Sequence, residues 1–191
     1  NDKPYRGDIL VSAVGDRLKL VNELDLEEYL LGVVPLEMPP TWPLEALKAQ
    51  AVAARTFALK NINRHRSQGY GLCDSSQCQV YGGVDVECTT SSTAVNGTAG
   101  IVAKYNGELI EAYYHACSGG RTETSGAVWG SNRPYLTVVI DEVDSSSPYA
   151  FWQKRFRLDQ LSQLLADQGY FLGKIRELEI VSRTDSGRAD Q

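Results

Sequence analysis

The segment from Trp42 to Ala58 constrains the fold of this chain more than any other part. It contains six alanines from Ala46 onward, and Pro43 suits the first turn of a helix. At about 100° per residue, one stripe of that helix carries Leu44, Leu47, Ala51, Ala54 and Ala58. Because alanine side chains are small, other elements can approach such a helix closely. The sequence therefore predicts a tightly packed helix.

Arg55 projects into the same stripe. An unpaired buried charge is very costly, so its guanidinium must find a carboxylate or carbonyl partner. Two interpretations are open: Arg55 is a structural anchor, or it is a cation that binds a ligand. The residues alone favour the anchor.

Short strands and further helices surround this segment. A hairpin is predicted around Gly15-Asp16, and a second one around Asn106-Gly107, the favoured pair for a type I′ turn. The predicted strands are 9–14, 17–22, 101–105, 108–114, 136–140 and 174–182, and the further helices are 26–31, 89–97 and 158–168. Strands and helices do not alternate regularly. We therefore predict an α+β fold, with mixed short β-sheets packed around the alanine-rich helix, in a single domain over residues 1–191.

Composition excludes some classes of function. The chain has 191 residues, of which 42% are hydrophobic, and a net charge of -5. A protein that binds nucleic acid mainly through phosphates usually carries a basic face, so we expect no nucleic-acid partner. No apolar stretch approaches the roughly 20 residues of a spanning helix. Asn1 is not an initiator methionine, which is consistent with removal of an export signal.

Glu37 is the candidate catalytic residue. It follows an apolar run from Tyr29 to Leu36 and precedes Pro39-Pro40. A carboxyl group in an apolar pocket keeps its proton nearer to neutral pH, as a general acid must. The alternative is a surface glutamate in a loop. Glu37 lies close in sequence to the alanine-rich helix, and together they predict a catalytic site.

His65, Cys73 and Cys78 are candidate metal ligands. Two cysteines five residues apart with a nearby histidine have the spacing of a zinc site, with Cys88 or water as fourth ligand. Disulfides Cys73–Cys78 and Cys88–Cys117 are the competing interpretation, since an even number of cysteines suits an oxidising compartment. Free thiols at these positions are a third interpretation.

Distinctive motifs occur along most of the chain: GVVPLEMP at 32–39, EALKAQAVAART at 45–56, QVYGG at 79–83, YHACSGG at 114–120 and PYL at 134–136. Together they resemble the SpoIID domain, found in stage II sporulation protein D and in amidase enhancers. Their order along the chain makes the resemblance specific. Family members usually continue beyond the SGR motif at 186–188, so we expect the chain to be truncated at Gln191.

The resemblance implies a lytic transglycosylase that cleaves peptidoglycan strands lacking stem peptides. It assigns the catalytic acid to Glu37 and an active-site arginine to Arg55. Motif positions that we expect to bind substrate are Gln50, Gln79, Tyr81, Tyr114, His115 and Ser118. No convincing second carboxylate accompanies Glu37 in the sequence, which favours ring closure within the sugar over hydrolysis.

The resemblance also bears on cofactors, partners and location. Some family members bind zinc through a cysteine pair and a histidine, but Gln77 stands where we would expect a histidine. We expect no required cofactor. A structural zinc and a Cys73–Cys78 disulfide are the two alternatives at the cysteine pair. The expected partners are glycan strands and a cell-wall amidase, in the cell wall or periplasm. A non-catalytic, wall-binding activator of an N-acetylmuramoyl-L-alanine amidase is the alternative function.

Overall fold

The computed structural model of the protein describes residues 2–190. Its contacts divide the chain into two units, Asn1–Tyr114 and His115–Gln191, and each is described by itself. The prediction of one domain over residues 1–191 stays a prediction. The first unit contains β1 (Asp8–Val14), β2 (Arg17–Glu23), α1 (Leu26–Glu37), α2 (Leu44–Asn61), η1 (Arg66–Gln68), η2 (Val84–Val86), α3 (Thr89–Gly97), β3 (Lys104–Tyr105) and β4 (Glu108–Leu109). The second contains α4 (Ser125–Trp129), η3 (Asp144–Ser146) and α5 (Leu158–Asp167).

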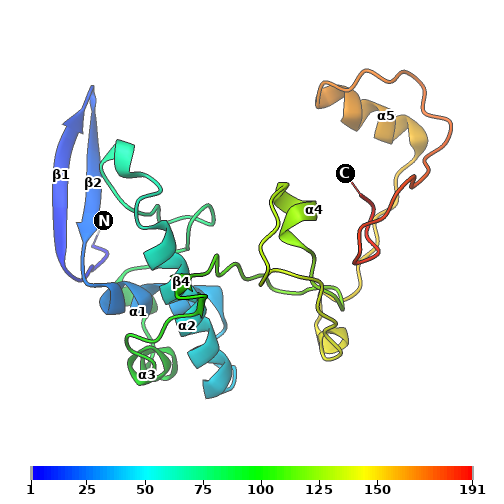
Figure 1. The fold of residues 1–191 in the computed structure, drawn as a ribbon. Helices are drawn as coiled ribbons and strands as arrows, with labels where there is room; N and C mark the ends of the chain where they lie inside the picture. Colours follow the sequence, from blue (N-terminus) through cyan, green and yellow to red (C-terminus); the bar gives the residue numbers. More distant parts are fainter. Residues whose placement is uncertain (1, 191) are drawn as a thin grey trace. The chain divides into compact units, whose positions relative to one another are not determined.

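The strands β1 and β2 form the predicted hairpin. They pair antiparallel with Val11 opposite Leu20, and the turn contains Gly15 at φ 61°. Side chains alternate between the two faces of a strand. One face therefore carries Ile9, Val11, Ala13, Leu18 and Leu20, which are all exposed. The hairpin projects from the helices of its unit (Figure 1).

Helix α1 is longer than predicted. It begins at Leu26 as expected but continues through Pro35 to Glu37, rather than ending near Leu31. A proline inside a helix removes one backbone hydrogen bond and normally ends the helix. Here Leu30, Val33 and Val34 are fully buried, and their packing offsets that loss. Glu37 is consequently the last residue of a helix.

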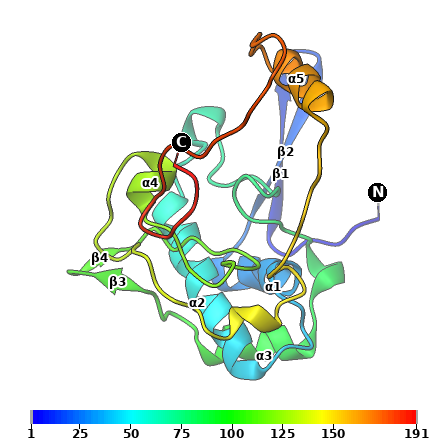
Figure 2. The ribbon, with the colours of Figure 1, turned by 90° about the vertical axis from the view of Figure 1, so that its right-hand side faces the viewer.

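Helices α1, α2 and α3 pack against one another around one apolar core (Figure 2). The fully buried core residues are Leu30, Val33, Val34, Leu47, Ala51, Ala54, Ala94 and Val95. The alanine stripe predicted for α2 is therefore confirmed, except that Leu44 is exposed. The α+β class is also confirmed, since helices occur with two-stranded antiparallel sheets in the described chain. None of the helices within residues 2–190 has the length and apolar character to cross a bilayer.

The second predicted hairpin has the expected turn but much shorter strands. Asn106 and Gly107 have φ values of 49° and 84°, as a type I′ turn requires. Pairing stops after two residues on each side. On one side the backbone turns to other partners instead, because Ala103 N–H donates to Thr56 Oγ1 and the Ile101 carbonyl accepts from Arg55.

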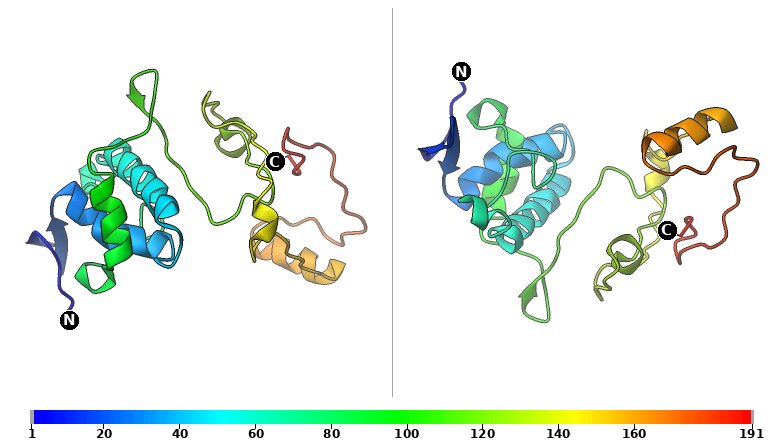
Figure 3. Two further views of the ribbon diagram at one scale, coloured as in Figure 1. Left: turned by 90° about the horizontal axis from the view of Figure 1, so that it is seen from below. Right: turned by 90° about the horizontal axis from the view of Figure 1, so that it is seen from above.

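In the second unit, short helices are joined by extended segments (Figure 3). Helix α5 confirms the predicted helix and ends before Gly169, which has φ 90°. The strands predicted at 136–140 and 174–182 are wrong, since only an isolated bridge between Arg121 and Ile140 forms in the first. At that bridge Thr122 N–H donates to Val139 O and Asp141 N–H donates to Gly120 O. The ladder goes no further, and the Thr122 hydroxyl donates to Thr137 O and accepts from Val139 N–H instead.

Candidate active site

The Glu37 carboxyl is half-buried at the C-terminal end of α1. Its Oε1 accepts a hydrogen bond of 2.8 Å from the backbone N–H of Val80. The segment that contains Val80 is tied to α1 a second time, through a bond of 3.0 Å from Gly82 N–H to Gly32 O. A side chain at position 32 would meet the Tyr81 ring at 2.5 Å, so this close approach requires glycine. The sequence motifs at 32–39 and 79–83 are therefore adjacent in space.

Gln79 is fully buried beside Glu37's partner Val80 and makes three side-chain hydrogen bonds. Its Nε2 donates to Ala54 O and to the Tyr114 hydroxyl, both at 3.2 Å. Its Oε1 accepts from the Tyr29 hydroxyl at 3.3 Å. The predicted site residues Glu37, Gln79 and Tyr114 are thus brought together.

The phenol of Tyr114 contacts Glu37 as well as Gln79. Burial first, and then the charge and side-chain hydrogen bond of Glu37, raise the pKa of Tyr114 to about 12 against the opposing effect of Gln79. Burial also raises the pKa of Tyr29 far above its usual range. Both phenols therefore stay protonated near neutral pH and can donate hydrogen bonds.

Two other predicted substrate-binding residues have different surroundings. The Tyr81 hydroxyl donates to Asn22 Oδ1 at 3.0 Å, and its ring lies 5.2 Å from the Tyr29 ring. Gln50 on α2 is only 7% exposed, and its Nε2 has no hydrogen-bond partner within residues 2–190. A buried amide donor without a partner is unfavourable, and a ligand with an acceptor group would satisfy it. The role of Gln50 in substrate binding stays a prediction.

Arg55 is an anchor inside the first unit. It is 1% exposed and pairs with Glu27 through two bonds of 2.8 and 2.7 Å. It also donates to Ile101 O at 3.0 Å and to Val95 O at 3.2 Å, so it joins α1, α2 and the end of α3. The hydrogen bond from Arg55 lowers the pKa of Glu27 against the effect of burial. The guanidinium is occupied by these structural partners, and its role in catalysis stays a prediction.

His65, Cys73 and Cys78 converge, with one ligand atom from each lying within 4.8 Å of the others. His65 Nε2 is 3.3 Å from Cys78 Sγ. Ligands about 2.0–2.3 Å from a tetrahedral zinc ion lie at comparable separations from one another, so this imidazole and these two thiols fit zinc. Cys88 is elsewhere, with its Sγ 3.1 Å from Ser91 Oγ at the start of α3. All four cysteines are thiols in the structure.

His115 and Ser118 belong to the second unit, and their role in substrate binding stays a prediction. His115 is exposed, whereas Ser118 is buried and donates to Asp144 Oδ2 at 2.7 Å. The same carboxylate oxygen accepts from Gly120 N–H at 3.0 Å. These bonds, that of Ser118 first, hold the pKa of Asp144 well below its usual range.

Arg188 links the two glycine-containing motifs of the second unit. Its guanidinium donates to the backbone carbonyls of Ser118, Arg121 and Thr122. Sequence reasoning did not identify Arg188, Asp144 or Tyr29. For Tyr29 one signal was available, because it lies about two helical turns before Glu37 on the same helix.

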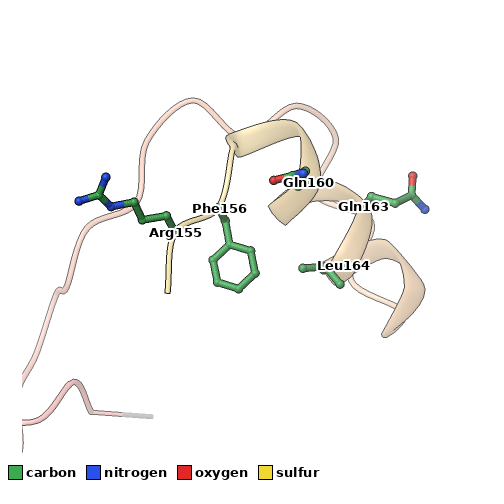
Figure 4. Close-up of a pocket in the computed structure, with 5 residues that line it drawn as sticks. All are labelled: Arg155, Phe156, Gln160, Gln163 and Leu164. Carbon is green, nitrogen blue, oxygen red and sulfur yellow. The ribbon is translucent and has the colours of Figure 1, made fainter. Parts of the chain in front are cut away.

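The second unit also has a shallow pocket beside α5, shown in Figure 4. It is lined by Arg155, Phe156, Gln160, Gln163 and Leu164, and the Phe156 ring points toward Leu164. None of the predicted site residues lines it, and its lining includes no carboxylate. It is therefore not the candidate active site.

Comparison with known families gives a match over residues 14–105 to the SpoIID family, described as stage II sporulation protein. This range contains Glu37, Gln79 and the cluster of His65, Cys73 and Cys78. The resemblance inferred from the sequence motifs is therefore confirmed, and this part of the chain belongs to the SpoIID family.

Relatives extend the similarity along the chain. An uncharacterised protein of Brachyspira hyodysenteriae is 33% identical over 99% of this chain and 51% of its own length. The amidase enhancer of Bacillus subtilis is 44% identical over 69% of this chain and 17% of its own length. Stage II sporulation protein D of the same organism is 35% identical over 81% of this chain and 50% of its own length. The chain thus spans about half the length, or less, of these relatives.

Proposed function

We propose that this chain is a lytic transglycosylase that cleaves peptidoglycan glycan strands lacking stem peptides. The observation that carries the proposal is the half-buried Glu37 carboxyl, held by Val80 N–H in the segment matched to the SpoIID family. The names of the relatives, one a sporulation protein and one an amidase enhancer, support a role at the cell wall. We also propose that the protein acts outside the cytoplasm, where that substrate lies.

A single carboxyl group suffices for the proposed reaction. Glu37 donates its proton to the glycosidic oxygen, and the bond from that oxygen to C1 breaks. The C6 hydroxyl of the same sugar then attacks C1 and gives its proton to the Glu37 carboxylate. The product is an anhydro sugar end, the acid is regenerated, and no water is consumed. A hydrolase would instead need a second group to activate water.

Replacing Glu37 by Gln tests the proposal. We expect cleavage of purified, peptide-free glycan to fall by at least about a hundredfold, because general acid catalysis typically contributes that much or more. Glu45→Gln is the matched control, since the Glu45 side chain is 81% exposed and pairs only with Lys48 among the described residues. Products are identified by mass as anhydro-ended fragments. Equal activity of the Glu37→Gln variant and wild type would refute the proposal.

A second candidate function is activation of a cell-wall amidase without cleavage of glycan. The similarity to an amidase enhancer favours it. The two functions are separated by assaying the protein with glycan alone and with an N-acetylmuramoyl-L-alanine amidase on intact peptidoglycan. A protein that leaves glycan uncut but raises amidase turnover is the activator.

We further propose that His65, Cys73 and Cys78 hold a structural zinc ion, with water as the fourth ligand. The convergence of the three side chains supports it. When bound, zinc would fix the loop that leads into Gln79 and Val80. Purified protein should contain one zinc per chain, and Cys78→Ser should lose the metal and lower the melting temperature, whereas Cys88→Ser should do neither. A metal-free protein with a Cys73–Cys78 disulfide would contradict this proposal.

A further inference from the structure

The amide of Gln79 is fixed in one orientation. An amide has two N–H donors and one carbonyl acceptor. One nitrogen donates to both Ala54 O and the Tyr114 hydroxyl, while the oxygen accepts from Tyr29. Because Gln79 is fully buried, rotation of the amide would leave these groups without partners in a place that water does not reach.

This orientation determines what the Tyr114 hydroxyl can do. Its oxygen already accepts a hydrogen bond from Gln79, so its own proton is available to an acceptor. The Glu37 carboxyl is that acceptor, since it forms a side-chain hydrogen bond with Tyr114. Glu37 therefore accepts one hydrogen bond from the Tyr114 hydroxyl and one from the backbone N–H of Val80.

We propose that Tyr29, Gln79 and Tyr114 form a hydrogen-bonded chain that orients the Glu37 carboxyl for proton transfer. This series of hydrogen bonds starts at Tyr29 on α1, passes through Gln79 and Tyr114, and ends at Glu37 on the same helix. Tyr29 and Gln79 are positioning residues that act through Tyr114. The effect of these hydrogen bonds on catalysis rests on the function proposed above.

The backbone strengthens this arrangement. Gln79 and Val80 are neighbours, so one short segment supplies both the central amide of the chain and the N–H that binds Glu37 Oε1. The same segment is attached to α1 by the Gly82 to Gly32 hydrogen bond. The carboxyl is therefore held by two donors whose positions are set together, and a loss of either should change its orientation.

Kinetics of phenylalanine variants test the proposal, since each keeps the ring and removes one hydroxyl. We expect Tyr114→Phe to lower kcat about tenfold with KM changed less than about twofold, because a misoriented acid slows the chemical step and not binding. Tyr29→Phe should lower kcat about threefold, and the double variant should be no slower than Tyr114→Phe alone. Tyr113→Phe, a change at the exposed neighbouring residue, should leave kcat unchanged. A raised KM with unchanged kcat in Tyr114→Phe would overturn the proposal and make Tyr114 a substrate-binding residue.

A measurement without substrate keeps the proposal testable if the chain cleaves no glycan or if a variant fails to fold. NMR titration of tyrosine ring carbons follows the ionisation of Tyr114 directly, and Tyr114→Phe identifies its signal. Because Glu37 raises the pKa of Tyr114, Glu37→Gln should lower it, whereas Glu45→Gln should not. An unchanged Tyr114 titration in Glu37→Gln would refute the contact. A shifted titration in a protein without glycan cleavage would support the chain of hydrogen bonds and refute the transglycosylase function alone.

Discussion

In the first unit, eight apolar side chains of α1, α2 and α3 are completely buried, whereas α5 in the second unit has no buried residue. Large apolar side chains of the second unit are instead exposed, among them Phe151 at 84% and Phe171 at 85%. In this unit several hydrogen bonds involve the same two charged groups. The Asp144 carboxylate accepts from Ser118 and Gly120, and the Arg188 guanidinium donates to the carbonyls of Ser118 and Arg121. The first unit is therefore stabilised mainly by apolar packing and the second by hydrogen bonds to charged groups.

Replacing Arg55 by Ala should have the largest effect on stability. It leaves Glu27 and the carbonyls of Val95 and Ile101 without their donor, and each interior polar group left unsatisfied costs about 1–3 kcal/mol. Urea unfolding, followed by circular dichroism of the helices, measures this. Arg55→Lys should be intermediate, because it keeps the charge but not the paired donors. A loss below about 1 kcal/mol for Arg55→Ala would show that this network is not an anchor.

Leucine to alanine changes in the two units test the comparison directly. Leu47 is fully buried, so Leu47→Ala should cost about 2–5 kcal/mol. Leu164 on α5 is 48% exposed, and Leu164→Ala should change stability by less than about 0.5 kcal/mol. Unfolding free energies of the two variants give the answer. Similar losses would mean that α5 is buried in solution and that the contrast between the units is wrong.

Ser118→Ala should destabilise the second unit by about 1.5–3 kcal/mol, since it removes a hydrogen bond to a charged carboxylate. Hydrogen exchange of the amides at 117–124 reports the local loss, while the amides of α2 should be unaffected. Ser146→Ala is the control, because the Ser146 hydroxyl donates only to the Val143 carbonyl in the described chain. Faster exchange in α2 than in 117–124 would contradict the separate stabilisation of the units.

The smallest expected effect is a pH dependence of the first unit that comes from Glu27. Its pKa is lowered in the folded state by Arg55, so the unfolded state binds the proton more readily. This contribution to stability is therefore present above the ordinary glutamate pKa and is lost as the pH falls through the folded value. Glu27→Gln should give a flatter decline of the melting temperature in acid than wild type. A parallel decline in the two proteins would refute this assignment.

The sequence predicted those parts of the fold that depend on local patterns. The α2 stripe, the β1–β2 hairpin and the Asn106-Gly107 turn follow from spacing and turn chemistry, and all are present. The C-terminal end of α1 was missed because packing of Val33 and Val34 overrides the effect of Pro35. The strand predicted at 136–140 does not form beyond one bridge, because the Thr122 side chain binds the backbone of Thr137 and Val139.

The sequence predicted which residues belong to the candidate site, but not how they contact one another. Motifs identified Glu37, Gln79 and Tyr114, and spacing identified His65, Cys73 and Cys78, which do converge. No local pattern states that Gln79 lies between Tyr29 and Tyr114, since those contacts join residues 50 and 35 positions apart. Such pairings depend on tertiary packing.

Cleavage of peptide-free glycan in water labelled with heavy oxygen tests the central claim most directly. If Glu37 serves as acid and then base for ring closure within the sugar, wild type yields fragments with anhydro ends. Each such fragment is lighter by one water than the corresponding hydrolysis product and carries no label. The Glu37→Gln variant should yield no fragments above background. Fragments with heavy oxygen at their new reducing ends would show hydrolysis, and would contradict the account.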